Sequence, residues 1–180
     1  MMDPEFVLLG DALWLDFVNT APEPGARTDT LPDLAAYHRW TKACRLPSDA
    51  DALEFSSIRR VRARLVLLAD ALTDGTPVPS RAISTINQLL SRSDGHEQLV
   101  RESGKWQVRF LPVEAQPALV AVARSAAATL AEQEVVLRYC ANPACRLRFH
   151  DRTPFHDRFW CSPWRACKEV PVERRRSALR

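Results

Sequence analysis

The sequence predicts an α+β fold: a mostly helical main domain with short β-hairpins, followed by a small cysteine-containing module at the C-terminus. Apolar residues recur at helical spacing over residues 48–74, whereas they alternate with polar residues over 98–111. Four of the five cysteines lie between residues 140 and 167. A chain of 180 residues has room for one main domain and one small module. We therefore expect one domain over residues 1–134 and a second over 135–180.

The N-terminal part is expected to begin with a short β element. Residues 6–20 are apolar and rich in strand formers, and Gly10 and Asp11 interrupt the run, which predicts a hairpin or a strand followed by a turn. Prolines and polar residues over 21–30 predict a loop. A helix is expected over residues 32–44, where it ends before the next proline.

The clearest helical pattern covers residues 48–74, with Ser48 as its N-cap and Gly75 as its C-terminal stop. Its apolar stripe consists of Ile58, Val61, Leu65, Leu68 and Leu72. The stripe covers only about two heptads, so we expect it to pack within the chain. A seam between two copies in a homodimer is the alternative.

Two helices and a hairpin are expected in the following part of the chain. Ser80 can cap a helix, and the alternation on both sides of Ser103-Gly104 predicts a β-hairpin over 98–111. Pro117 is suited to the first turn of an Ala-rich helix that runs to about Glu134. The expected packing residues of the first helix and the hairpin are Ile83, Ile86, Leu89, Leu90, Leu99, Val100, Trp106, Val108 and Phe110.

The charge is distributed unevenly along the chain. From Arg138 to the end, eleven basic residues stand against four acidic ones, a net charge of +7. The whole chain carries +3, so residues 1–137 carry −4. An acidic body with a basic tail indicates that the tail meets an anionic partner such as DNA or RNA, with a basic soluble surface as the alternative.

Neither a secretory signal nor a membrane span is visible. Residues 1–20 lack a basic start, and no apolar run approaches the roughly 18 residues that a transmembrane helix needs. We therefore expect a cytoplasmic protein without a membrane partner. In a reducing compartment, clustered cysteines indicate metal ligands or redox groups before disulfides.

The cysteines form two pairs, Cys140-x4-Cys145 and Cys161-x5-Cys167, separated by fifteen residues. Two such pairs can build a closed tetrahedral thiolate site for one structural Zn²⁺. Asn142-Pro143 favours a turn in the first pair, and Ser162 can cap a helix in the second. This arrangement is like a treble-clef zinc site. Neither pair has the C-x-x-C spacing of a redox dithiol.

The cysteine region has two other interpretations. Four unrelated buried cysteines are one alternative, because free cysteine is often a core residue. His150 and His156 lie between the pairs and could each replace a cysteine as a ligand, although four thiolates already complete the shell.

The two ends of the chain also resemble a known family. Residues 138–162 resemble the CGNR zinc finger in their C-x4-C knuckle, their Phe149-His150-Asp151 segment and their Trp160-Cys161-Ser162 triplet. Residues 15–20, Leu-Asp-Phe-Val-Asn-Thr, are similar to the signature that opens the associated ABATE domain, described as a stress-induced transcriptional regulator. The resemblance implies a nucleic-acid-binding regulator with a zinc finger. The Gly-Asn-Arg that names the family is absent, since Lys168-Glu169-Val170 follows the fourth cysteine.

The basic residues of this tail are the candidate nucleic-acid contacts. They are Arg146, Arg148, Arg152, Arg158, Arg165, Lys168, Arg174, Arg175 and Arg176. The aromatic residues among them, which could stack on bases or cover the metal site, are Phe149, Phe155, Phe159 and Trp164. Pro171 should interrupt the basic helix of the family, so we expect binding dominated by phosphates.

No catalytic motif is found in the sequence, so we expect a protein that is not an enzyme. Asp16 lies in an apolar run, where a carboxylate more often caps a turn or pairs with an arginine than acts in catalysis. Two alternatives to the regulator stay open. One is a protein-interaction module in which zinc is purely structural, and the other is a small-ligand-binding N-terminal domain lined by Trp14, Trp40 and Trp106.

Overall fold

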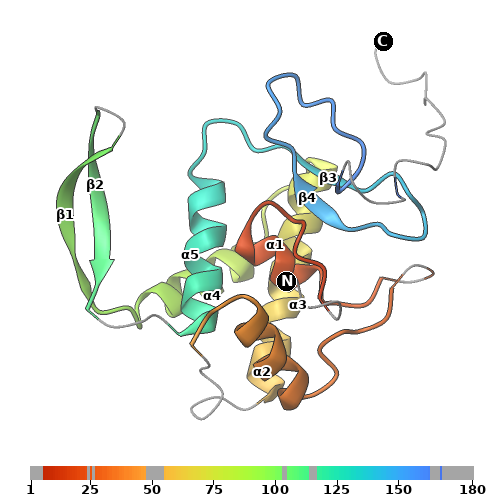
Figure 1. Ribbon diagram of the computed structural model, residues 1–180, viewed down its shortest axis with the longest axis horizontal. Helices are drawn as coiled ribbons and strands as arrows, with labels where there is room; N and C mark the ends of the chain where they lie inside the picture. Colours follow the sequence, from red (N-terminus) through yellow and green to blue (C-terminus); the bar gives the residue numbers. More distant parts are fainter. Residues whose placement is uncertain are drawn as a thin grey trace.

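A computed structural model describes residues 6–23, 25, 27–47, 55–102, 105–113, 117–162 and 167. The described chain combines helices with two small antiparallel sheets, which confirms the predicted fold class (Figure 1). Its elements are α1 (Leu13–Val18), α2 (Leu34–Ala43), α3 (Phe55–Asp74), α4 (Ser80–Leu90), β1 (Gly95–Glu102), β2 (Lys105–Pro112), α5 (Ala118–Leu130), β3 (Leu137–Tyr139) and β4 (Arg148–His150).

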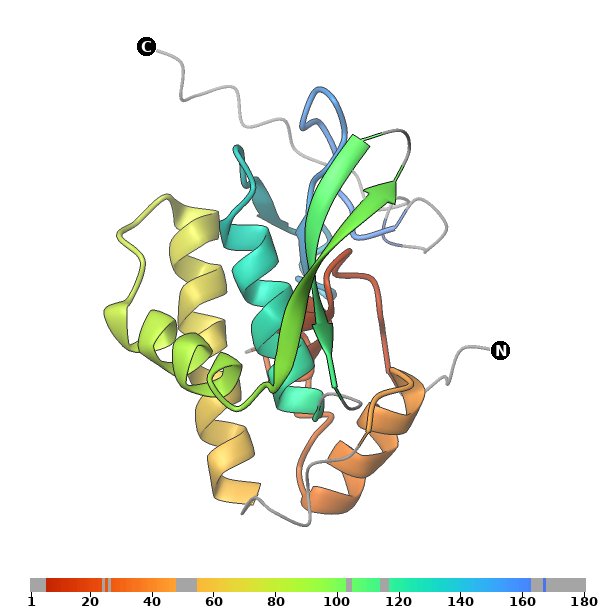
Figure 2. The ribbon, with the colours of Figure 1, turned by 90° about the vertical axis from the view of Figure 1, so that its left-hand side faces the viewer.

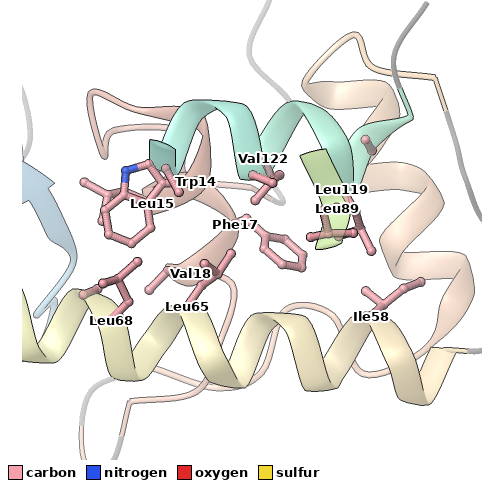
Figure 3. Close-up of a cluster of buried hydrophobic side chains, with 14 of the residues drawn as sticks. Trp14, Leu15, Phe17, Val18, Ile58, Leu65, Leu68, Leu89, Leu119 and Val122 are labelled. Atoms are coloured by element: carbon pink, nitrogen blue, oxygen red, sulfur yellow. The ribbon is translucent and has the colours of Figure 1, made fainter. Parts of the chain in front are cut away.

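The short helix α1 lies at the centre of the core, where it contacts α3, α5 and β4. Figure 3 shows Trp14, Leu15, Phe17 and Val18 between α3 and α5. All four side chains are fully buried. The β element expected over residues 6–20 is therefore wrong for residues 13–18. A helix surrounded by other elements is apolar on every side, so its sequence lacks the polar face by which helices are recognised.

The next two helices agree with their sequence patterns. Asp33 caps α2, because its carboxylate accepts a hydrogen bond from the backbone N–H of Ala36 at 2.7 Å. In α3, Ile58, Leu65 and Leu68 are buried in the main core, and the stripe therefore packs within the chain. The expected N-cap at Ser48 lies outside the described residues.

Helices α4 and α5 pack against each other, and α4 also contacts α3 (Figure 2). Ser80 is the first residue of α4 rather than its cap, which is Pro79. Helix α5 follows Pro117 and ends at Leu130, four residues before the expected Glu134. Its small residues allow close packing against α1 and α4.

The predicted hairpin is present as β1 and β2, which pair antiparallel from Gly95 opposite Pro112 to Glu102 opposite Lys105. It extends away from the helices in Figure 1. Leu99 is 61% exposed, so its expected packing role is wrong, because that part of the strand has no helix over it. The side chains of Trp106 and Val108 lie outside the described part of the chain.

The C-terminal segment forms a second hairpin from β3 and β4, with Leu137 opposite His150. Strand β3 contacts α3, and β4 contacts α1, so the segment lies against the helical part (Figure 1). The boundary between residues 134 and 135 stays a prediction. Among the described helices, none combines the length and apolar character that crossing a bilayer requires.

Candidate metal centre

The first cysteine pair is held in a tight turn between β3 and β4. Asn142 organises this turn: its carbonyl accepts from the N–H of Cys145 at 2.9 Å, and its side chain accepts from the N–H of Ala144 at 2.9 Å. Arg146 then adopts a left-handed conformation with φ of 46°. The backbone N–H of Cys140 closes the turn on the carbonyl of Leu147 at 2.8 Å.

The four cysteine sulfurs converge on one point. Their Sγ atoms all lie within 4.8 Å of one another. Cys161 Sγ is 3.8 Å from Cys145 Sγ and 4.0 Å from Cys167 Sγ. A tetrahedral ion with metal–sulfur bonds of about 2.3 Å requires sulfur separations of about 3.8 Å, whereas a disulfide requires about 2.05 Å. The spacing therefore fits four ligands of one metal ion.

The chemistry of the donors also fits a cation. The four side chains are between 1% and 9% exposed. Hydrogen bonds from the thiols of Cys145 and Cys161 lower the pKa of Cys140, and the same interaction raises the pKa of Cys145 to about 11. Four thiols so close oppose one another's ionisation, because like charges repel at short range. A divalent metal would offset this repulsion and allow all four to ligate as thiolates.

Arg27 supplies a positive charge to the cluster from the N-terminal part of the chain. Its guanidinium donates a hydrogen bond to the carbonyl of Asn19 and lies 4.0 Å from a carboxylate oxygen of Glu23. Burial lowers the pKa of Arg27, and the charges of Glu23, Cys145 and Cys161 offset this in part. Its Nε and Nη2 atoms are buried and make no hydrogen bond within the described residues. A guanidinium with spare donors beside thiolates can stabilise them electrostatically.

The segment between the cysteine pairs is attached to the helical part through β4. Asn19 forms two hydrogen bonds with the backbone of Arg148, at 2.7 and 2.9 Å. The Arg148 side chain is 4% exposed and pairs with Asp70 at 2.8 Å and Glu23 at 3.2 Å. Tyr139 on β3 also donates to Asp70, at 2.6 Å. Polar contacts therefore join α1 and α3 to the cysteine module.

Three more of the arginines expected to contact nucleic acid form ion pairs within the described residues. Arg146 pairs with Glu23 at 3.3 Å, Arg152 with Glu132 at 2.6 Å, and Arg158 with Asp11. The exposed fractions of the three arginine side chains are 43%, 52% and 22% respectively. Arg146 and Arg152 thus keep substantial contact with solvent, whereas Arg148 is enclosed.

The aromatic residues that could stack on bases also include both buried and exposed side chains. Phe149 is fully buried beneath the guanidinium of Arg158, whose centre lies 4.4 Å from the ring centroid. Phe155 is 85% exposed and Phe159 is 46% exposed. Phe149 therefore serves packing, and the other two rings are accessible to a partner.

Several sequence-predicted residues of the tail lie outside the described residues. They include the helix expected after Ser162. The single residues are Trp164, Arg165, Lys168, Pro171, Arg174, Arg175 and Arg176.

Asp151 organises the loop that leads to the second cysteine pair. It is fully buried and accepts hydrogen bonds from Thr153, Arg158 and Arg138. Burial alone would raise the pKa of Asp151, but these hydrogen bonds hold it below its usual value. His150 and His156 do not belong to the sulfur cluster, which contains only cysteines. His150 is buried and lies 3.6 Å from Glu132.

The remaining candidates from the sequence, Asp16 and the two tryptophans Trp14 and Trp40, have structural roles. Asp16 accepts a hydrogen bond from the N–H of Gly10 at 2.8 Å, so it stabilises the turn before α1. Trp14 and Trp40 are fully buried in the main core, and Trp14 donates to Thr129 at 3.0 Å. Neither tryptophan lines an open site.

Sequence reasoning missed the residues that join the cysteine module to the rest of the chain. The roles of Arg27, Asp70 and Glu23 depend on contacts between segments far apart in sequence, and no local pattern marks them. A usable signal existed only for Asn19, a polar residue at the end of the apolar run that forms α1.

Comparison with protein-family models places most of the main domain in a known family. Residues 11–133 match the ABATE family, described as "Putative stress-induced transcription regulator". The match covers more than half of the chain and ends before the first cysteine of the cluster. A search of curated proteins finds no match.

Proposed function

The chain belongs to the ABATE family, and on this basis we propose that it is a zinc-binding, non-enzymatic transcriptional regulator whose C-terminal module contacts nucleic acid. The N-terminal domain would sense a signal or dimerise. The observation that carries the proposal is the convergence of four buried cysteine sulfurs beside a basic segment.

Zinc is the metal that this donor set suits best. Cys140, Cys145, Cys161 and Cys167 would hold one Zn²⁺ in a closed tetrahedral shell, which is the usual form of a structural zinc site. The ion would supply folding energy to a segment with little apolar core. Elemental analysis of protein purified without chelator should find about one zinc per chain, with four sulfurs at about 2.3 Å by X-ray absorption. Absence of metal would contradict this assignment.

The nucleic-acid contact is supported by charge and exposure. The net charge of +7 over residues 138–180 becomes about +5 when four thiolates and one Zn²⁺ are counted. Arg146 and Arg152 are partly exposed, and the accessible rings of Phe155 and Phe159 are available for stacking on bases. Arg148 and Arg158 would act by positioning the module. Arg165, Lys168 and Arg174–Arg176 remain proposed contacts from their sequence alone.

A titration of labelled DNA and RNA with the full chain tests this function. Binding should fall steeply between low and physiological salt, because released counterions drive phosphate binding. The triple variant Arg174→Ala/Arg175→Ala/Arg176→Ala should bind more weakly and with a shallower salt dependence. Arg81→Ala, which removes an exposed arginine from α4, serves as the control and should bind like the wild type.

A protein-interaction module is the second candidate, and one observation favours it. Four arginines of the tail already pair with Asp11, Glu23, Asp70 or Glu132 of the N-terminal part. Part of the positive charge of the tail is therefore neutralised by carboxylates of the same chain. If the wild type binds neither DNA nor RNA at low salt, the regulator proposal fails and docking of an acidic protein becomes the favoured function.

A further inference from the structure

A cavity of about 270 Å³ opens between α3 and α4, away from the cysteine cluster. Its apolar part is formed by Val61 of α3, Leu89 of α4 and Leu119 of α5. Figure 2 shows α4 lying beside α3 and α5. The volume approaches that of small-molecule sites, which begin at about 300 Å³.

The polar part of the cavity is strongly basic. Arg60 and Arg64 of α3 and Arg92 after α4 line it, and none of its lining residues is acidic. Helix α3 has no carboxylate before Asp70, and α4 has none at all. Asp70 already accepts hydrogen bonds from Arg148 and Tyr139. The positive charge of the cavity is therefore not balanced by its own walls.

One of the arginines is held in position by a buried hydroxyl. Thr85 is 3% exposed, accepts a hydrogen bond from Arg64 Nη1 at 2.6 Å and donates to the carbonyl of Arg81 at 2.8 Å. This bond uses one of the five N–H donors of a guanidinium. Within the described residues, Arg60 and Arg92 make no side-chain hydrogen bond or ion pair. The guanidinium groups that could bind an anion therefore line the same cavity as the apolar side chains of Val61, Leu89 and Leu119.

We propose that this cavity binds a small organic anion, with a phosphate or carboxylate group among Arg60, Arg64 and Arg92 and a short apolar part on Val61, Leu89 and Leu119. Guanidinium groups suit both anions, because their planar donors can engage two oxygens at once. The inference deepens the sensing role in the proposed function and rests on it. Helix α3 carries both the cavity and Asp70, the residue that pairs with the cysteine module.

Amide chemical shifts of the full chain, titrated with hexyl phosphate and separately with hexanoate, test the proposal. At least one of these anions should produce saturable shifts around residues 57–64 and 85–92, with a dissociation constant of about 1 mM or lower. Inorganic phosphate tests the head group alone and should bind more weakly. Hexylammonium has the same apolar chain and the opposite charge, and it should leave these amides unshifted.

The double variant Arg60→Gln/Arg92→Gln should weaken binding about tenfold or more, because charged hydrogen bonds dominate anion affinity. Arg59→Gln/Arg81→Gln removes the same charge from exposed positions of α3 and α4 outside the cavity, and it should bind like the wild type. Thermal melting should show that both variants remain folded.

The proposal is overturned if neither anion gives saturable shifts up to about 10 mM, if hexylammonium shifts the same amides, or if the control variant loses as much affinity. It is also overturned if a DNA duplex displaces hexyl phosphate and itself shifts the amides of residues 57–64 and 85–92, since the arginines would then contact a nucleic-acid backbone. A failure of the whole protein to bind DNA or RNA would contradict the proposed regulator while leaving the anion titration valid, so the two failures are distinguishable.

Discussion

The side-chain amide of Asn19 pairs with the backbone of Arg148: Nδ2 donates to the carbonyl at 2.7 Å, and Oδ1 accepts from the N–H at 2.9 Å. The two residues are 129 positions apart, and Asn19 is 6% exposed. An asparagine that satisfies both backbone groups of one residue substitutes for a neighbouring strand. It thereby fixes β4 against the end of α1.

Asn19→Ala should destabilise the protein by about 2–3 kcal/mol, because the N–H and carbonyl of Arg148 lose their partners in a buried position. Urea denaturation measures the free energy of unfolding, and hydrogen exchange should show faster exchange of the Arg148 amide. Asn87→Ala, at an exposed position of α4, is the matched control and should change stability by less than about 0.5 kcal/mol. Equal effects of the two substitutions would contradict the role of Asn19.

Removal of the metal should unfold the cysteine module before the helical part. Cys140→Ser or Cys161→Ser should abolish metal binding and reduce hydrogen-exchange protection over residues 137–162, because the ion supplies folding energy there. The end of α1 should also lose protection, since Asn19 is bonded to β4. Cys44→Ser lies outside the sulfur cluster and should retain the metal. Equal loss of protection throughout α3 would show that the two parts unfold together.

Arg27 is expected to strengthen metal binding through its charge. Arg27→Gln should lower metal affinity about tenfold, because groups that surround the ligands tune affinity by that order. Arg27→Lys keeps the charge and should lose less. Competition with a chelator of known affinity measures the change. Arg45→Gln removes an exposed arginine after α2 and serves as the control. If Arg27→Gln binds the metal as tightly as this control, the charge of Arg27 has no role at the site.

Much of the helical fold could be predicted because its periodicity follows burial. In α3, the apolar residues at helical spacing are buried where the helix contacts α1 and α4, while most of its charged residues occupy the other faces. The β1–β2 hairpin could be predicted from alternation around a turn. Helix α1 could not, since its complete burial removes the polar face that distinguishes a helix from a strand.

The candidate site was predictable to the extent that its residues are close in sequence. The spacing of the two cysteine pairs indicated one cluster, and the structure brings Cys140, Cys145, Cys161 and Cys167 together. The environment of the arginines depends instead on the three-dimensional arrangement. Arg148 is followed closely by Arg152 in the sequence, yet one is enclosed and the other is half exposed. Only Arg148 lies on β4, which contacts α1, and its side chain pairs with Asp70 of α3.

The partly buried carboxylate of Asp16 should make stability depend on pH. Burial raises the pKa of Asp16 from 3.8 to about 7, and the hydrogen bond from Gly10 offsets this only in part. Between pH 3.8 and about pH 7, the carboxyl group of Asp16 keeps its proton in the folded protein but releases it in the unfolded chain. The contribution of Asp16 to stability is therefore fully present below about pH 4 and is lost as the pH rises through about 7, by roughly 1.4 kcal/mol per pH unit.

Asp16→Asn should flatten this dependence, because the amide oxygen can still accept from Gly10 but the side chain carries no charge at any pH. At pH 8 the variant should be more stable than the wild type, and at pH 4 the two should be similar. Denaturant unfolding at a series of pH values measures both effects. Asp74→Asn, an exposed position at the end of α3, should keep the wild-type slope. A variant at Asp16 that also kept this slope would show that the carboxylate is ionised in the folded protein throughout the range, and that the hydrogen bond from Gly10 outweighs its burial.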